Sequence, residues 1–297
     1  MLSLKSVIKK AEKEKKAVGH FNISELAALK AIAEVAAELG VPVIIGTSEG
    51  ERDFIDPHKA VALVRELREE HHQPVFINAD HTRSLDKVKE AVLAGYDAIL
   101  FDGGKLPLEE NIRQTKEVFE YVKNKNPKIL VEGELGFIGS SSEVFKELPK
   151  GAALEEKDLT TSQEASEFVK ETGVDLLAPA VGNIHGMLVP SGVEGFTPMN
   201  PPLNIKRIQE IKAAVKVPLV LHGGSGTRDS DFLEAIHAGV SIIHINTEIR
   251  VAWRHGLEKA FKDNPEEVTP YKLMKPSLDE MKKVVYNRLK LFNRISE

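Results

Sequence analysis

Short apolar runs alternate with longer amphipathic patterns along the whole chain. The apolar runs are typical of buried strands and cover 17–21, 41–46, 74–78, 98–101, 129–131, 174–179, 217–221 and 241–245. The patterns between them have helical periodicity and cover 24–39, 57–72, 85–94, 108–124, 162–172, 204–215, 229–238 and 248–262. Several helical patterns end at a glycine, as helix C-caps do, at Gly40, Gly95, Gly173 and Gly239. Strands that are separated by helices predict parallel βαβ units.

The number of these units indicates the fold class. Eight strand–helix units in 297 residues predict an α/β fold, the (β/α)8 TIM barrel, with a doubly wound open sheet as the alternative. No proline- or serine-rich linker divides the chain, so we expect a single domain over 1–297. A charged amphipathic helix should begin the chain. An irregular link at 264–276 and an added C-terminal helix at about 277–291 should follow the last unit.

One predicted connection is unusually long. It covers 135–160, after the fifth strand, and contains the run Gly139-Ser140-Ser141-Ser142. Loops of this length inside a compact domain are usually functional or disordered. We interpret it as a mobile lid over an active site, and a simple surface excursion is the alternative.

Polar residues gather where the predicted strands end. They are His20, Asn22, Asn78, Asp80, His81, Asp102, Glu132, Glu134, Asn183, His185, His222, His244, Asn246 and Thr247. In a TIM barrel the C-terminal ends of all the strands meet at one mouth, which holds the catalytic groups. Strand alternation puts Glu132 and Glu134 on the same face, where inward carboxylates need a partner or a cation.

Three of these residues suggest a metal site. His81, His185 and His222 each follow a different strand, and three neutral imidazoles with an open position suit a catalytic divalent metal, for which we expect zinc. The alternative for each is a hydrogen-bonded loop histidine. Asp80 precedes His81 and is a candidate general base or metal-orienting carboxylate, although a turn aspartate is also compatible with that position.

The remaining histidines carry less information. His58, His71, His72, His237 and His255 fall on helical patterns, so we expect them to be solvated. The role of His20 stays open. The metal hypothesis therefore rests on the three histidines at strand ends.

Residues 217–228, VPLVLHGGSGTR, combine a predicted strand, His222 and a glycine-rich turn before a helix. Exposed backbone N–H groups and a helix N-terminus both favour a bound anion. Because glycine-rich turns are common, this stretch predicts an anion site only together with the residues around it.

Composition excludes several classes of function. The net charge is −5 and basic residues are dispersed among acidic ones, so we expect no nucleic-acid partner. There is no cysteine, which excludes disulfides and thiolate metal ligands. The N-terminal pattern lacks the apolar core of a signal peptide, and no apolar run reaches the roughly 18 residues that a membrane span needs. We expect a cytoplasmic protein without a membrane partner.

Together these residues resemble the zinc-dependent class II ketose-bisphosphate aldolases, the fructose- and tagatose-bisphosphate aldolase family. The resemblance covers nearly the whole chain. It is carried by Asp80-His81 with Ser84-Leu85 following, VEGELG at 131–136, GNIHG at 182–186, LHGGSG at 221–226 and NTE at 246–248.

The resemblance implies a role for each of these residues. His81, His185 and His222 would bind zinc, which polarises the ketose carbonyl and stabilises the enediolate formed when C3–C4 breaks. Asp80 would exchange a proton with the C4 hydroxyl. The phosphate of dihydroxyacetone phosphate would contact Gly186, Gly223, Gly224, Ser225, Asn246 and Thr247. Asn22, Asp102, Glu132 and Glu134 would lie near the substrate or metal. The family also allows a monovalent cation near the phosphate loop and forms dimers or tetramers, so we expect a homo-oligomer.

The sequence departs from the family pattern at several positions. His244 stands where most members have a substrate-binding Asn, Thr82 where a second His is usual, and Leu188-Val189 where a Tyr-Lys pair is frequent. Glu143 is our candidate for the lid acid that handles the C3 proton. Lys275 and Arg52 are candidates for binding the second phosphate.

These observations predict reversible cleavage of a ketose 1,6-bisphosphate, with fructose 1,6-bisphosphate as the leading substrate. The products would be dihydroxyacetone phosphate and glyceraldehyde 3-phosphate. Tagatose bisphosphate, another ketose phosphate and a sugar-phosphate-binding barrel with little turnover are the alternatives. A metal-dependent hydrolase and a Schiff-base aldolase fit the sequence less well, because it shows neither a paired-metal ligand set nor a lysine at a strand end.

Overall fold

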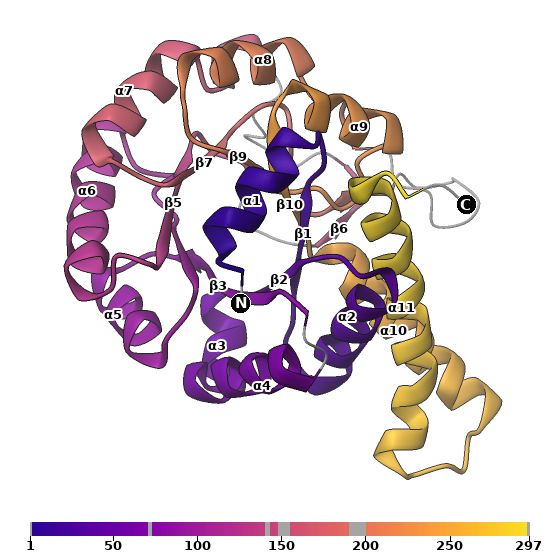
Figure 1. Cartoon of the computed structure of the whole chain (residues 1–297). Coiled ribbons are helices and arrows are strands. Elements are labelled where there is room, and N and C mark those ends of the chain that lie inside the picture. Colours follow the sequence, from indigo (N-terminus) through magenta and orange to yellow (C-terminus); the bar gives the residue numbers. More distant parts are fainter. Residues whose placement is uncertain (1, 71–72, 140–142, 148–154, 190–199, 296–297) are drawn as a thin grey trace.

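The computed structural model describes residues 2–70, 73–139, 143–147, 155–189 and 200–295. A closed barrel of eight parallel strands forms the centre, and helices surround it (Figure 1). In sequence order, the barrel strands are β1 (Val18–Asn22), β2 (Val43–Thr47), β3 (Val75–Thr82), β4 (Ala98–Phe101), β5 (Leu130–Leu135), β7 (Leu176–Pro179), β9 (Leu219–Leu221) and β10 (Val240–Ile245). Closure between β1 and β10 confirms the TIM barrel and excludes the open sheet.

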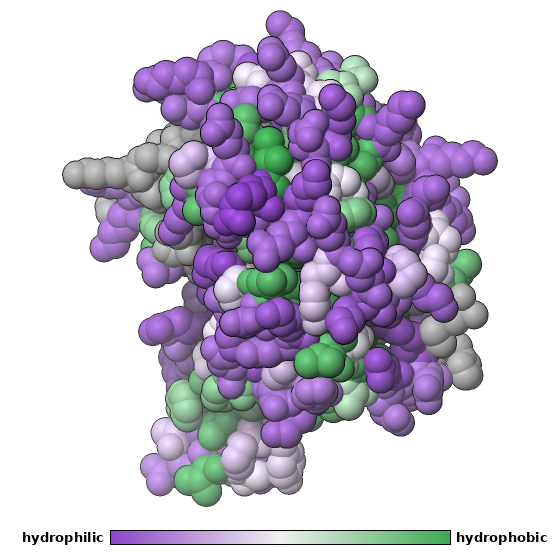
Figure 2. Space-filling view, turned by 90° about the vertical axis from the view of Figure 1, so that its left-hand side faces the viewer, coloured by the Kyte–Doolittle hydropathy of each residue, from purple (hydrophilic) through white to green (hydrophobic). Residues whose placement is uncertain are grey.

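The helices follow the strands as the periodicity predicts. They are α2 (Leu26–Leu39), α4 (Pro57–Glu70), α5 (Leu85–Ala94), α6 (Leu108–Lys125), α7 (Ser162–Thr172), α8 (Ile205–Ala214), α9 (Asp229–Ala238) and α10 (Thr247–Asp263). One helix, α3 (Glu49–Ile55), was not expected; it begins with a capping box between Ser48 and Glu51. The outer face that carries α6 is predominantly hydrophilic (Figure 2), as a solvated ring of helices should be.

The charged N-terminal pattern forms α1 (Leu4–Lys13), which lies across one end of the barrel (Figure 1). Its apolar side chains Leu4, Val7, Ile8 and Ala11 belong to one buried cluster with inward residues of the strands, among them Val18, Phe76 and Leu130. These residues fill the interior from the end opposite the strand C-termini. Apolar side chains therefore fill this end of the barrel, and the charged side chains gather at the opposite mouth.

One expectation about an irregular segment needs correction. The C-terminal helix α11 runs from Pro270 to Asn293, so it begins well before 277 and includes Pro276. The helix tolerates this proline, and α10 and α11 pack together as a hairpin that projects from the barrel (Figure 1). The long segment 135–160 contains a short strand, β6 (Val144–Phe145), and a 3-10 turn, η1 (Glu156–Asp158).

The short strand β6 pairs in parallel with β8 (Met187–Leu188), just after the GNIHG segment. This small sheet lies outside the barrel and ties the long loop to the segment that carries His185. Residues 140–142 and 148–154 of the predicted lid lie outside the described residues. No helix in the described part of the chain is long and apolar enough to cross a membrane.

Candidate active site

Strand β3 directs two consecutive side chains to the barrel mouth. Neighbouring residues of a regular strand point to opposite faces. Here the register with β4 shifts between Ala79 and Thr82, and His81 has a positive φ of 43°. A bulge of this kind re-aims side chains, and a non-glycine residue in this conformation costs of the order of 1–3 kcal/mol. Asp80 and His81 therefore line the same cavity.

The three histidines converge in this cavity. Ring centroids are 4.7 Å apart for His81 and His185, 5.1 Å for His81 and His222, and 5.7 Å for His185 and His222. One possible ligand atom from each histidine and from Glu134 lies within 4.8 Å of the others. Four groups from four separate segments thus meet at one point.

The hydrogen bonding of these groups fits a bound cation. His185 Nε2, His222 Nδ1 and Glu134 Oε2 are buried and have no hydrogen-bond partner among the described residues. Burying polar atoms without a partner is costly, and a divalent metal accepts imidazole and carboxylate ligands. The donor set therefore fits a divalent metal ion.

Two carboxylates orient the imidazoles. Asp102 Oδ2 lies 3.0 Å from His81 Nδ1, and Glu132 Oε1 lies 2.8 Å from His222 Nε2. A carboxylate on one ring nitrogen fixes the tautomer and leaves the other nitrogen for a metal. Glu132 thus explains why Nδ1 is the available nitrogen of His222.

The electrostatics also favour a cation here. Burial alone would lower the pKa of His81, but Asp80, Asp102 and Glu134 outweigh it and raise that pKa to about 10. Burial, reinforced by Asp102, raises the pKa of Glu134 to about 7. Burial and the neighbouring His81 hold the pKa of His185 well below its ordinary value. The site thus attracts positive charge, while the lowered pKa keeps the His185 ring neutral.

Asp80 is buried and held from one side. Its Oδ2 accepts a hydrogen bond from Asn22 Nδ2 at 2.9 Å, and the same amide donates to Glu51 Oε2 at 2.9 Å. Its Oδ1 has no hydrogen-bond partner and lies 3.5 Å from His244 Nδ1. Burial would raise the pKa of Asp80, but His81 and His244 hold it well below its usual range. An ionised carboxylate with one open oxygen can accept a proton.

His244 lines the cavity and stacks on a second histidine. The His20 and His244 rings are 3.5 Å apart and almost parallel, at 3°, and His20 Nε2 lies 3.2 Å from Asn78 Nδ2. His244 Nε2 has no hydrogen-bond partner in the described structure. The sequence left the role of His20 open. His20 lies two residues before Asn22 on β1, so the two side chains share one face of the strand. This spacing was the signal in the sequence that His20 lies beneath the site.

The glycine-rich turn after β9 forms another wall. Gly223 has a φ of 61°, and a Cβ there would lie 2.3 Å from Ile184 O, so only glycine fits. The backbone N–H groups of Gly223 and Ser225 have no backbone acceptor among the described residues. Ser225 Oγ accepts hydrogen bonds from the backbone N–H groups of Asn246 and Glu248, both at 3.2 Å. The turn is held by these hydrogen bonds and presents N–H donors, as an anion site requires.

The structure brings most of the predicted residues together. The cavity is lined by Asn22, Asp80, His81, His185, Gly186, His222, Gly223, Ser225, His244, Asn246 and Thr247. Gly224 supports this wall because its N–H donates to His244 O at 3.1 Å. Asp102, Glu132 and Glu134 contact the histidines as described above.

Other candidates lie elsewhere. The Glu143 side chain is exposed, and its backbone carbonyl accepts a hydrogen bond from Met187 N at 2.8 Å. Arg52 is buried and donates to the backbone of Thr47 and Asp80, so it supports β3 and is not available for a phosphate. Lys275 pairs with Asp279 on α11, at 3.5 Å, and does not line the cavity.

An adjoining recess contains two arginines that the sequence did not single out. It has a volume of about 190 Å³ and shares His81 and His185 with the histidine cavity. Arg83 Nε lies 3.2 Å from Asp102 Oδ2, and Arg250 donates to Glu51 Oε1 at 2.8 Å. The sequence around these arginines does not distinguish them from ordinary surface residues. Arg83 lies in the turn between β3 and α5, and Arg250 lies on α10.

His58, His237 and His255 are exposed, as expected. His71 and His72 lie outside the described residues.

The chain also resembles known proteins over its whole length. Residues 2–296 match the family described as "Fructose-bisphosphate aldolase class-II".

The chain is 35% identical over 294 residues to a 6-phospho-5-dehydro-2-deoxy-D-gluconate aldolase of Bacillus licheniformis, covering 98% of this chain and 94% of that one. It is 34% identical to a fructose-bisphosphate aldolase of Geobacillus stearothermophilus, with 98% and 96% covered. The crystal structure of the YdjI aldolase from Escherichia coli K12 superposes with a TM-score of 0.79 at 28% identity, covering 98% and 97% of the two chains. The chain therefore belongs to the class II fructose-bisphosphate aldolase family, whose enzymes are metal-dependent aldehyde-lyases.

Proposed function

We propose that the protein catalyses the reversible aldol cleavage of a ketose phosphate, with fructose 1,6-bisphosphate as the leading substrate. The observation that carries this proposal is that Asp80, the converging histidines and the Gly223–Ser225 turn line one cavity. A proton acceptor, a cation site and an anion site lie within the span of a small sugar phosphate. The products would be dihydroxyacetone phosphate and glyceraldehyde 3-phosphate.

In this proposal His81, His185 and His222 hold a zinc ion, and Glu134 lies beside it. When bound, the ion supplies Lewis-acid polarisation of the ketose carbonyl. The Asp80 carboxylate accepts the proton of the C4 hydroxyl while the C3–C4 bond breaks and its electrons move toward the C2 carbonyl. In the reverse direction Asp80 returns that proton.

The donor half of the substrate is held by the glycine-rich turn. The N–H groups of Gly223 and Ser225, with Gly186 and Thr247 nearby, would bind its phosphate. Holding the phosphate fixes the distance between the reacting carbons and Asp80, which is a large part of catalysis in such reactions. His244 would face a substrate hydroxyl with its open Nε2. A monovalent cation beside this turn and Glu143 as the lid acid remain predictions.

The adjoining recess would receive the aldehyde half. Arg83 and Arg250 line it, and each guanidinium carries five donors that suit phosphate or carboxylate groups. This arrangement also suits a substrate such as tagatose bisphosphate, or the phosphorylated dehydrodeoxygluconate in the name of the Bacillus licheniformis relative. A binding-only role is disfavoured because the family consists of enzymes.

A coupled assay for release of dihydroxyacetone phosphate tests the proposal. Fructose 1,6-bisphosphate, tagatose 1,6-bisphosphate and 6-phospho-5-dehydro-2-deoxygluconate would be compared, the last by its own aldehyde product. We expect cleavage of at least one, complete inhibition by EDTA, and no inactivation by borohydride with substrate. Activity that survives EDTA, or borohydride trapping at a lysine, would contradict the mechanism. The predicted homo-oligomer and cytoplasmic location remain predictions.

A further inference from the structure

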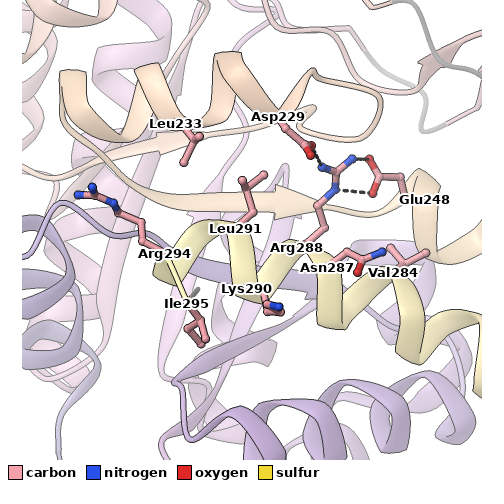
Figure 3. A pocket seen from close by; sticks show the side chains of 10 residues that line it. All are labelled: Asp229, Leu233, Glu248, Val284, Asn287, Arg288, Lys290, Leu291, Arg294 and Ile295. Carbon is pink, nitrogen blue, oxygen red and sulfur yellow. Dashed lines mark hydrogen bonds and ion pairs between the residues drawn. The ribbon is translucent and has the colours of Figure 1, made fainter. Parts of the chain in front are cut away.

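A groove between α9 and α11 lies on the outer side of the glycine-rich turn that follows β9. It has a volume of about 850 Å³ and is lined by charged residues, among them Asp229, Glu248 and Arg288 (Figure 3). Arg288 Nε and Nη2 donate to the two carboxylate oxygens of Glu248, both at 2.8 Å, and Nη1 donates to Asp229 Oδ1 at 2.6 Å. Paired, bidentate contacts of this kind are the strongest that an arginine makes.

Glu248 connects this groove to the glycine-rich turn. Its Oε1 accepts a hydrogen bond from Gly226 N at 2.9 Å, and its own backbone N–H donates to Ser225 Oγ at 3.2 Å. Gly226 has a φ of 82°, and its Cα faces Asn200, which donates to Ser225 O at 2.8 Å. The Glu248 carboxylate therefore holds the turn from behind, together with the Asn200 amide.

This carboxylate poses an electrostatic problem for the proposed substrate. Glu248 is buried, and it places a negative charge directly behind a turn that would receive a phosphate. Like charges repel strongly where water is excluded. Arg288 supplies the compensating charge, and it packs over the Phe232 ring at 5.0 Å, which fixes its plane. Burial would lower the pKa of Arg288, but Glu248 and Asp229 raise it, so the guanidinium stays charged.

We propose that Arg288 is a positioning residue for the substrate phosphate: it holds the Glu248 carboxylate against Gly226 and neutralises its charge. Among the described residues, Arg288 reaches the turn through Glu248, also pairs with Asp229 at the start of α9, and does not line the histidine cavity. The role extends to any substrate with a phosphate on the donor half. It rests on the proposed function insofar as that half is phosphorylated.

The test compares Arg288→Met with Arg288→Met/Glu248→Gln. The single change leaves a buried, unpaired carboxylate, so we expect the KM for the phosphorylated ketose to rise at least about tenfold, with a smaller effect on kcat. In the double variant the glutamine carbonyl still accepts from Gly226 N but carries no charge, and we expect most of the affinity to return. Arg288→Lys should be intermediate because it lacks the bidentate contact.

Two controls separate positioning from general damage. Lys290→Met removes a cation from the same helix and groove and should leave KM unchanged. In the synthesis direction, unphosphorylated dihydroxyacetone as the donor should show the same KM in Arg288→Met and in the wild type. Equal losses with dihydroxyacetone and its phosphate, or no recovery in the double variant, would overturn the proposal.

Calorimetric titration of the metal-loaded protein with inorganic phosphate and with dihydroxyacetone phosphate gives a second readout. We expect weaker binding in Arg288→Met and recovery in the double variant. If the wild type binds dihydroxyacetone phosphate but cleaves no ketose phosphate, the proposed function fails while the role of Arg288 is still tested. If the wild type cleaves its substrate and Arg288→Met binds phosphate equally well, the role of Arg288 fails alone.

Discussion

Individual residues in the mouth combine burial with unsatisfied polar atoms, which is unusual in a folded protein. Asp80 Oδ1, His185 Nε2, His222 Nδ1 and His244 Nε2 all lack a hydrogen-bond partner in the described structure. Each would be costly in a site with no ligand. Their concentration at one point indicates that the residues are arranged for a bound cation and substrate rather than for stability.

The role of Asp80 gives the first prediction. Asp80→Asn keeps the shape and can still accept from Asn22, but it cannot take a proton, so we expect kcat to fall at least about 100-fold. Zinc content, measured by plasma mass spectrometry, should stay at the wild-type value. Asp86→Asn, on an exposed turn of α5, is the matched control and should keep full activity. Full activity in Asp80→Asn would exclude it as the base.

His20 gives a pH dependence. Burial lowers its pKa from 6.5 to about 4, so below pH 6.5 the unfolded chain binds a proton that the folded protein does not. The stability associated with neutral His20 is complete above about pH 6.5 and is lost as the pH falls toward 4, by about 3 kcal/mol in total. We expect His20→Asn to lose less unfolding free energy than the wild type between pH 6.5 and 4.5. Urea unfolding in the presence of EDTA measures how the free energy of unfolding changes with pH in the wild type and in His20→Asn. The same pH dependence in both proteins would refute the assignment.

At the scale of elements, local irregularities make the site. The bulge in β3 aims Asp80 and His81 together, and the turns after β7 and β9 approach so closely that side chains are excluded. The small β6–β8 sheet anchors the long loop next to His185. Regular strands would have directed half of these side chains outward.

The turn after β9 gives a prediction with an internal control. Gly223 and Gly40 have nearly the same positive φ, 61° and 64°, but a Cβ at 223 meets Ile184 O whereas a Cβ at 40 meets nothing within 4 Å. Gly40→Ala should therefore cost only the backbone strain, about 1–2 kcal/mol. We expect Gly223→Ala to cost more and also to raise the KM for the phosphorylated substrate.

Urea unfolding and steady-state kinetics measure the two effects. Gly40→Ala should retain the wild-type KM because it lies at the end of α2, outside the cavity. Equal free energies of unfolding and equal KM values for the two variants would show that the turn tolerates a side chain, contrary to the described packing.

At the scale of the whole molecule, closing the barrel assembles the site. The metal-ligand candidates come from β3, β5, the segment after β7 and the end of β9, and α1 fills the other end of the barrel with apolar side chains. Because no single element contains the site, a bound metal should tie these segments together and stabilise the fold as a unit.

Metal removal is therefore the prediction at this scale. A ligand that binds only the folded state adds about 4 kcal/mol when its concentration is 1,000-fold above Kd. We expect the melting temperature measured by calorimetry to fall on EDTA treatment and to return with Zn²⁺. His81→Ala should abolish the shift, whereas His58→Ala, an exposed histidine on α4, should retain it. A melting temperature that EDTA does not change would argue against a structural metal link.

The sequence by itself determined the barrel and its order of strands and helices, and it predicted which polar residues lie at the strand ends. Strand and helix periodicities are local, and polar residues at strand ends can be read without coordinates. Asp80, the three histidines and the GGSG turn were predicted in this way, and the structure places them in one cavity. The family match confirms the fold and the class of enzyme.

Tertiary structure decided what depends on contacts between distant segments. The stacking of His20 on His244, the recess with Arg83 and Arg250, and the contact of Arg288 with Glu248 each join residues far apart in the chain. Arg52, one candidate for binding the second phosphate, is buried and donates to the backbone carbonyl of Asp80, which no local pattern indicates. The start of α11 was missed because Pro276 is compatible with either a link or a helix, and packing against α10 favours the helix. Periodicity reports which face of an element is buried, but the partner of each charge is determined only when the barrel closes.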